Sequence, residues 1–176
     1  MFDLDQFVAD CRAALAAGAS GAVTEVMARA VADPGAIMAA LGEPNEAIST
    51  TLFQAPDITI LNLAWAPYHW TLPHNHNVRA VIGMYTGGEN NMLWRRLPDA
   101  PHRVEAAGAK SLRQGDVAVL GKDIIHSVTN PLGKISAALH VYDGDFFAPG
   151  RSMWDAESLD EAPYDRARNS PMFSRR

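Results

Sequence analysis

The chain lacks several features that would assign it to a functional class at once. It has a single cysteine, Cys11, so no internal disulfide can form, which fits a reducing compartment. The net charge of −5 comes without the basic footprint of a nucleic-acid-binding protein. No apolar run approaches the roughly 20 residues that span a bilayer, and the acidic N-terminus lacks the basic region of a signal peptide. We therefore expect a cytoplasmic protein that binds neither nucleic acid nor a membrane.

The N-terminal part of the chain predicts helices. Residues 2–41 are rich in alanine, and their apolar side chains recur mostly at steps of three and four, which is the helical period. A second such pattern begins at Val23, Pro34-Gly35 interrupts it, and a short third helix is expected over Ala36–Leu41. We expect residues 1–48 to form a helical brace against the rest of a single domain.

Residues 49–149 predict an all-β unit. Ile58–Trp65 shows alternation, and Gly, Pro, Asn and Asp separate short apolar segments along this part of the chain. Such a pattern is typical of a sandwich, a jelly roll or a barrel. The polar, mixed-charge residues 150–176 are expected to form a C-terminal extension that packs on the same domain. The expected strands are Thr50–Gln54, Ile58–Ala66, Ala80–Tyr85, Asn91–Arg96, Val117–Gly121, His126–Val128 and Ile135–Tyr142.

His74 and His76 are the most informative residues of the chain. Residues two apart on a strand point to the same face, so both imidazoles can reach one metal ion. His126, in a second expected strand, offers a third ligand. Asn130 is interpreted as a turn residue before Pro131, and His69 and His102 are expected to be exposed. The sequence thus predicts a mononuclear metal site at His74, His76 and His126.

These two segments resemble the motifs of the cupin superfamily. His74-Asn75-His76 followed by Gly87 is similar to the first cupin motif, and Gly115 followed by His126 and Asn130 is similar to the second. The resemblance implies a double-stranded β-helix, or jelly-roll barrel, with these residues lining its interior. The carboxylate position of the first motif falls at Ala80 or Val81, neither of which can bind a metal.

A ligand set of three neutral histidines is similar to that of the cysteine dioxygenase family of thiol dioxygenases. Trp65 lies nine residues before the histidine pair, and His140 and Tyr142 match the family's late Ser-x-His-x-Tyr strand, with Ala138 at the serine position. The match covers roughly residues 58–147. It implies that His140 and Tyr142 are catalytic residues beside the metal, although the residues alone also allow His140 to be a fourth ligand or a core residue.

The chain departs from the family in two further ways. The position of the cysteine that animal-type enzymes crosslink to the late tyrosine is Val81, and residues 47–66 contain no arginine to bind a substrate carboxylate. Arg79, Trp65 and Tyr68 are instead assigned to substrate binding. Strand alternation places Arg79 on the face opposite His74 and His76 unless a bulge intervenes.

The function expected from these residues is Fe(II)-dependent oxidation of a small thiol, of the cysteine or 3-mercaptopropionate class, to its sulfinate. Imidazole nitrogen suits iron, and a facial set of three ligands leaves positions open for the thiol and dioxygen. Ni, Mn and Zn are alternative metals. The alternative functions are a metal-dependent cupin isomerase or lyase and a non-catalytic cupin that binds a small molecule. A monomer and a homodimer are both compatible with the sequence.

Overall fold

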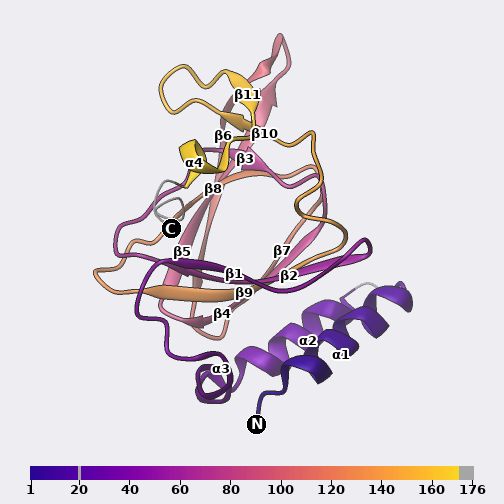
Figure 1. Ribbon diagram of the computed structural model, residues 1–176. Helices are drawn as coiled ribbons and strands as arrows, with labels where there is room; N and C mark the ends of the chain where they lie inside the picture. The colour runs from indigo at the N-terminus through magenta and orange to yellow at the C-terminus, as the bar shows by residue number, and fades with distance from the viewer. Residues whose placement is uncertain (20, 171–176) are drawn as a thin grey trace.

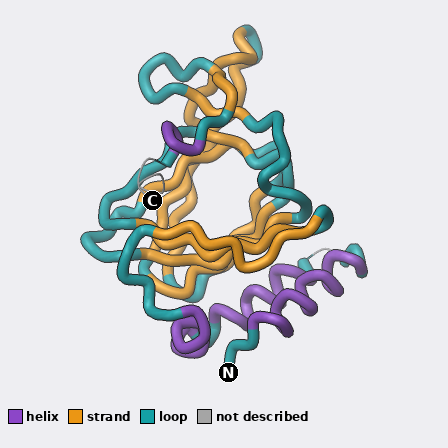
Figure 2. Tube along the Cα trace, viewed as in Figure 1, coloured by secondary structure: helices purple, strands orange, loops and turns teal. Residues whose placement is uncertain are grey.

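The computed structural model describes residues 1–19 and 21–170. Two antiparallel β-sheets face each other around a common interior, and a layer of helices covers the outside of one sheet (Figures 1 and 2). The five-stranded sheet has the order β1 (Ile48–Ala55), β2 (Ile58–Trp65), β9 (Ser136–Tyr142), β4 (Ala80–Thr86), β7 (Val117–Leu120). The six-stranded sheet has the order β11 (Glu161–Pro163), β10 (Ser152–Trp154), β3 (His74–Asn75), β8 (Ile125–Thr129), β5 (Gly88–Leu97), β6 (Ala100–Arg113). The predicted double-stranded β-helix with N-terminal helices is confirmed.

The helices are α1 (Leu4–Ala16), α2 (Ala22–Val31), α3 (Pro34–Leu41) and the short α4 (Arg166–Asn169). Asp3 caps α1 by accepting a hydrogen bond from the backbone N–H of Gln6. α3 begins at Pro34, two residues before the helix expected over Ala36–Leu41. Proline is favourable at the first helical position, because the backbone N–H that it lacks would have no hydrogen-bond partner there. None of the helices in the described ranges is long and apolar enough to cross a membrane.

The five-stranded sheet is apolar on both faces because each face packs against a different layer. On β4, Val81 and Tyr85 point outward into a core shared with α1 and α2, whereas Ile82 and Met84 point into the space between the sheets. All eight residues of β2 are buried for the same reason. The central strands β2, β4 and β9 are therefore buried on both sides, and their inner faces form one wall of the interior.

The six-stranded sheet is only partly covered, and one of its strands, β6, was not predicted from the sequence. β6 spans 14 residues and pairs with β5 in a long hairpin that projects from the barrel (Figure 1). Most of its side chains are exposed, and alanine, lysine, arginine and glutamate give it little strand propensity. The pairing with β5 therefore determines its conformation.

The C-terminal segment, residues 151–170, continues the six-stranded sheet. Met153 on β10 pairs with His74 on β3, so the segment lies directly beside the first histidine strand. Arg96 on β5 donates two hydrogen bonds to the carboxylate of Glu161, which holds β11 to the barrel. Residues 171–176 of the extension expected over 150–176 lie outside the described residues.

Gly83 lies where α2 packs tightly against β4, and this contact leads to a prediction about stability. A Cβ added at this position on β4 would overlap the Met27 side chain and lie 2.8 Å from a methyl of Val31, both on α2. Overpacking of this kind costs about 1–3 kcal/mol. We expect Gly83→Ala to lower the free energy of unfolding by that amount in urea denaturation. Gly108→Ala, at a site with no neighbour within 4 Å, is the control, and equal stability of the two variants would contradict this packing.

Candidate metal centre

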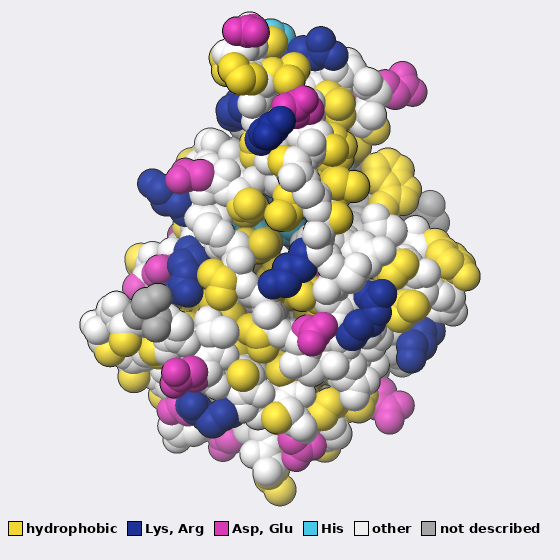
Figure 3. All heavy atoms as spheres, turned by 180° about the vertical axis from the view of Figure 1, so that it is seen from behind, with side chains coloured by type: hydrophobic (Ala, Val, Ile, Leu, Met, Phe, Trp, Pro, Cys, Tyr) yellow, Lys and Arg dark blue, Asp and Glu magenta, His cyan; other side chains and the backbone are white. Residues whose placement is uncertain are grey.

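The three predicted ligands converge inside the barrel. His74 on β3 and His126 on β8 are direct partners in the sheet register, and His76 follows two residues after His74. All three residues are buried: His74 is 6% exposed, His76 3% and His126 2%. Their ligand atoms all lie within 4.8 Å of one another. In the space-filling view from behind, histidine atoms are visible between hydrophobic side chains near the middle of the face (Figure 3).

Hydrogen bonds behind the rings determine which nitrogens face the centre. The Nδ1 of His74 lies 2.8 Å from the backbone oxygen of Leu72, and the Nδ1 of His126 lies 2.7 Å from the side-chain oxygen of Asn91. An oxygen of either kind only accepts, so both Nδ1 atoms carry the hydrogen and both Nε2 atoms present a lone pair. This arrangement of a hydrogen-bonded outer nitrogen and a free inner nitrogen is that of a metal-binding imidazole.

The spacing of the inner nitrogens fits a single divalent ion. The Nε2 of His76 lies 3.0 Å from that of His126 and 3.3 Å from that of His74. Ligands about 2.1 Å from one ion are about 3.0 Å apart at a right angle and about 3.4 Å apart at a tetrahedral angle. Lone pairs that face each other in a buried site need a cation or a proton between them. The donor set therefore fits a metal held on one side only, with its other side open to the cavity.

Burial keeps the three imidazoles neutral. Desolvation, with a smaller contribution from the charge of Arg151, lowers the pKa of His126 to about 3. Desolvation also lowers the pKa of His74 and His76 well below the usual value, with the neighbouring histidines adding to the effect. Neutral imidazole is the form that binds a metal, so the site does not depend on deprotonation near neutral pH.

A buried polar pair on β5 supports His126 from behind. Asn91, which accepts from His126, donates in turn from its Nδ2 to the Oε1 of Glu89 at 2.9 Å. Burial raises the pKa of Glu89, while hydrogen bonds from Asn91 and Trp65 oppose that rise. Sequence analysis missed both residues. The expected strand began only at Asn91, whereas β5 begins at Gly88 and includes Glu89 two residues earlier, on the same face as Asn91.

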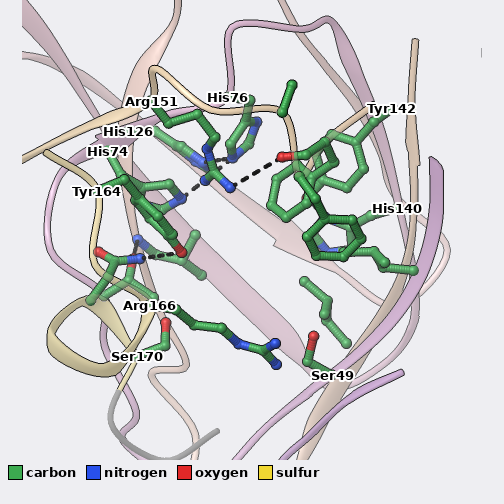
Figure 4. Close-up of a pocket in the computed structure, with 18 of the residues that line it drawn as sticks. Ser49, His74, His76, His126, His140, Tyr142, Arg151, Tyr164, Arg166 and Ser170 are labelled. Atoms are coloured by element: carbon green, nitrogen blue, oxygen red, sulfur yellow. Dashed lines mark hydrogen bonds between the residues drawn. The ribbon is translucent and has the colours of Figure 1, made fainter. Parts of the chain in front are cut away.

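His140 and Tyr142 lie across the cavity from the triad, on β9 (Figure 4). The hydroxyl of Tyr142 is 3.2 Å from the Nδ1 of His140, and the His140 Nε2 makes no hydrogen bond with the described residues. Burial lowers the pKa of His140 to about 3 and raises that of Tyr142 well above its usual value. The neutral pair has two hydrogens and uses one between its members, so one donor hydrogen is left for the cavity. His140 does not belong to the group of converging ligand atoms.

The cavity beside the triad has a volume of about 430 Å³. Leu61, Leu63 and Trp65 of β2 and Phe146 form part of its apolar wall, and the C-terminal segment contributes Arg151, Tyr164 and Arg166. None of the residues that line it within the described ranges is acidic. The volume is typical of sites for small molecules, and the charge of the lining is positive.

The substrate-binding residues expected from the sequence are only partly found at the cavity. Trp65 lines it, but Arg79 and Tyr68 do not. Arg79 lies in the connection between β3 and β4, where Asn77 has a left-handed backbone with φ of 59°, so the strand alternation of the histidines does not extend to it. Tyr68 has a left-handed backbone, with φ of 58°, and is 69% exposed. The structure thus places Arg79 and Tyr68 outside the cavity lining. His69, expected to be exposed, is 5% exposed and stacks on Trp65.

Arg151 is the cavity cation that sequence analysis missed. Its Nε donates to the backbone oxygen of Asn75, and its guanidinium lies between the rings of Phe146 and Tyr164, 4.1 and 3.9 Å from their centres. It lies 75 residues after His76 in the sequence, and only the pairing of β10 with β3 brings it to the site. No local motif signals that contact.

Comparison with solved structures finds similar proteins, two of which are described as having a double-stranded β-helix. A protein with a double-stranded β-helix domain from Klebsiella pneumoniae is 14% identical, covers 64% of this chain and 88% of its own, and has a TM-score of 0.48. An RmlC-like cupin family protein from Methanocaldococcus jannaschii is 10% identical over 59% of this chain and 85% of its own, with a TM-score of 0.49. A DMSP lyase from Ruegeria pomeroyi is 12% identical over 62% of this chain and 52% of its own, with a TM-score of 0.48.

No family model matches the chain. At identities this low and TM-scores below 0.5, the lyase activity belongs to the Ruegeria protein alone and is not carried over to this chain.

The hydrogen bond between Asn91 and the Nδ1 of His126 leads to a prediction about metal affinity. Asn91→Leu removes the acceptor that orients the His126 ring, and the loss of such a contact typically weakens metal binding 10- to 100-fold. We expect that loss in a competition titration of Zn²⁺ against a chromophoric chelator. Asn90→Leu is the matched control, because Asn90 faces the other side of β5 and accepts from Ser111. Equal affinities of the two variants would contradict the assigned role.

Burial of His69 generates a prediction for pH dependence. Desolvation lowers its pKa to about 4 in the folded protein, whereas the unfolded chain takes up the proton near pH 6.5. The unfolded state therefore binds more protons between these values, and the free energy of unfolding falls as the pH decreases through that window. His69→Phe keeps an aromatic ring on Trp65 but cannot titrate. Between pH 6 and 5, the free energy of unfolding of the variant, measured by urea denaturation, is expected to change less steeply with pH than that of the wild type, by up to about 1.4 kcal/mol per pH unit. Equal slopes for the two proteins would contradict this prediction.

Proposed function

We propose that the protein is an Fe(II)-dependent dioxygenase that oxidises a small thiol to its sulfinate. The observation that carries the proposal is the ligand set: three neutral imidazoles, with the apolar Ala80 and Val81 buried on β4 where a fourth, acidic ligand was sought in the sequence. Three neutral ligands leave the full positive charge of the ion in the site, which favours an anionic thiolate. Iron held in this way would supply the redox chemistry that activates dioxygen.

The cavity walls suit this reaction. Leu61, Leu63 and Phe146 give the cavity an apolar wall, and electrostatic interactions are stronger in apolar surroundings than in bulk water. The pair of His140 and Tyr142 keeps one donor hydrogen for an oxygen atom of the substrate or product. The overall reaction is balanced without a further reductant, because the thiol gains both atoms of dioxygen and its sulfur supplies the four electrons.

Oxygen consumption tests the proposal. Protein loaded anaerobically with one equivalent of Fe(II) is expected to consume oxygen only when cysteine, 3-mercaptopropionate or cysteamine is added. With ¹⁸O₂, mass spectrometry is expected to find two labelled oxygens in the sulfinate. His126→Ala is expected to abolish uptake, since it removes one of three ligands.

His102→Ala is the control, because the His102 side chain is 65% exposed and lies outside the cavity lining. Stoichiometric iron binding with no uptake for any of the three thiols would refute the proposed function.

A further inference from the structure

Glu89 on β5 is an acid that is buried without a cation. It is 0% exposed and is the only aspartate or glutamate that is buried among the described residues. None of the ion pairs in the described part of the chain includes it, and the side chains that donate hydrogen bonds to it, Asn91 and Trp65, are uncharged. Because burying a carboxyl in this way lowers stability, its position behind His126 indicates a role in the metal centre.

Two hydrogen bonds connect this acid to a predicted metal ligand. Glu89 and Asn91 are two residues apart on β5, so they share the buried face of the strand. The Nδ2 of Asn91 donates to the Oε1 of Glu89 at 2.9 Å, and its Oδ1 accepts from the Nδ1 of His126 at 2.7 Å. On the other side of the same imidazole, the Nε2 of His126 faces the Nε2 of His76 at 3.0 Å. The state of the Asn91 amide therefore acts directly on the nitrogen that would bind the ion.

The Asn91 amide has two orientations of nearly the same shape, which exchange its oxygen and its NH₂ group. With the NH₂ turned to His126, the ring would have to accept at Nδ1 and carry its hydrogen on Nε2, where that hydrogen would block the metal. Glu89 excludes this orientation, since its Oε1 accepts from the NH₂ group but has no hydrogen to give to the amide oxygen. The same holds for a carboxyl protonated on Oε2, so the amide keeps its orientation when Glu89 takes up a proton.

The other two ligands do not depend on a side chain in this way. The Nδ1 of His74 faces the backbone oxygen of Leu72 at 2.8 Å, and a backbone oxygen cannot exchange places with a donor. The Nδ1 of His76 makes no hydrogen bond with the described residues, so its outer nitrogen does not select a tautomer. Of the three imidazoles, His126 is thus the one whose tautomer is set by a group that could turn.

We propose that Glu89 is a positioning residue of the metal centre, which fixes the Asn91 amide and through it the tautomer of His126 that presents Nε2 to the ion. Glu89 acts from behind the ligand and is not part of the cavity lining. The inference rests on the three-histidine site and not on the oxidation of a thiol.

The tautomer of His126 tests this role in the metal-free protein. With ¹⁵N-labelled histidine, NMR spectra that correlate the ring nitrogens with the ring carbon-bound hydrogens show which nitrogen carries the hydrogen. We expect wild-type His126 and His74 to carry it on Nδ1, and Glu89→Leu to convert His126 to a mixture of tautomers. His74 is the control within the same spectrum and is expected to stay unchanged. A His126 that remains entirely the Nδ1–H form in Glu89→Leu would overturn the proposal.

Metal affinity tests the consequence, by competition of Zn²⁺ against a chromophoric chelator. Glu89→Leu is expected to weaken Zn²⁺ binding roughly 10- to 100-fold, as for the loss of other contacts behind a ligand. Glu89→Gln is expected to lose less, because its amide oxygen can still accept from Asn91, although its NH₂ group can also face that residue. Glu105→Leu removes an acid on β6 whose side chain is 42% exposed, and is the matched control.

The remaining outcomes are decisive in the same way. A loss of affinity in Glu89→Leu with the His126 tautomer unchanged would show that the residue acts only through packing, and would overturn the proposal. A loss in Glu89→Gln as large as that in Glu89→Leu would also overturn it, because the accepting oxygen would then be irrelevant.

This proposal and the proposed function can fail separately, because neither measurement uses a thiol or oxygen. If Glu89→Leu changes the His126 tautomer and weakens Zn²⁺ binding but the Fe(II)-loaded wild type oxidises no thiol, the positioning role stands and the dioxygenase function fails. If the wild type oxidises a thiol but Glu89→Leu binds Zn²⁺ as tightly as the wild type, the function stands and the positioning role fails.

Discussion

Three imidazole Nε2 atoms turned toward one another in a buried interior are the constraint on which the rest of the site depends. The pairing of His74 with His126 across β3 and β8 brings two of them together, and the two-residue period of the strand adds His76. A shift of this register by one residue would turn the ligands to the other face. Leu72 and Asn91 orient the rings of His74 and His126 through hydrogen bonds to their Nδ1 atoms. Burial keeps the rings neutral, which is the form that binds a metal.

The C-terminal segment belongs to the site as much as the histidine strands do. β10 extends the sheet beside β3, and Arg151 reaches from the start of this segment into the cavity. The result is an asymmetric chamber, with the triad and a cation on one side and the neutral pair of His140 and Tyr142 on the other. The lining includes the arginines Arg151 and Arg166 and, within the described residues, no acidic side chain.

The sequence predicted the parts of this structure that are encoded locally. The helical period predicted α1 and α2, alternation predicted β2, and the spacing of His74 and His76 indicated a shared face. β6 could not be predicted, because its exposed polar residues become a strand only through the pairing with β5. Arg151 could not be predicted either, since its role comes from a contact between residues that are far apart in the chain. His69 was wrongly expected at the surface because a single histidine gives no signal of the Trp65 ring that buries it.

The measurement that tests the central claim most directly is the X-ray absorption spectrum of the protein loaded with one equivalent of Fe(II). The convergence of His74, His76 and His126 predicts the multiple-scattering signature of three imidazoles, with no sulfur ligand, because Cys11 lies in the core between the helices and the sheet. The same spectrum from His126→Ala is expected to lose one imidazole or to show no bound iron. A wild-type spectrum with fewer than three imidazoles, or one that His126→Ala leaves unchanged, would contradict the account.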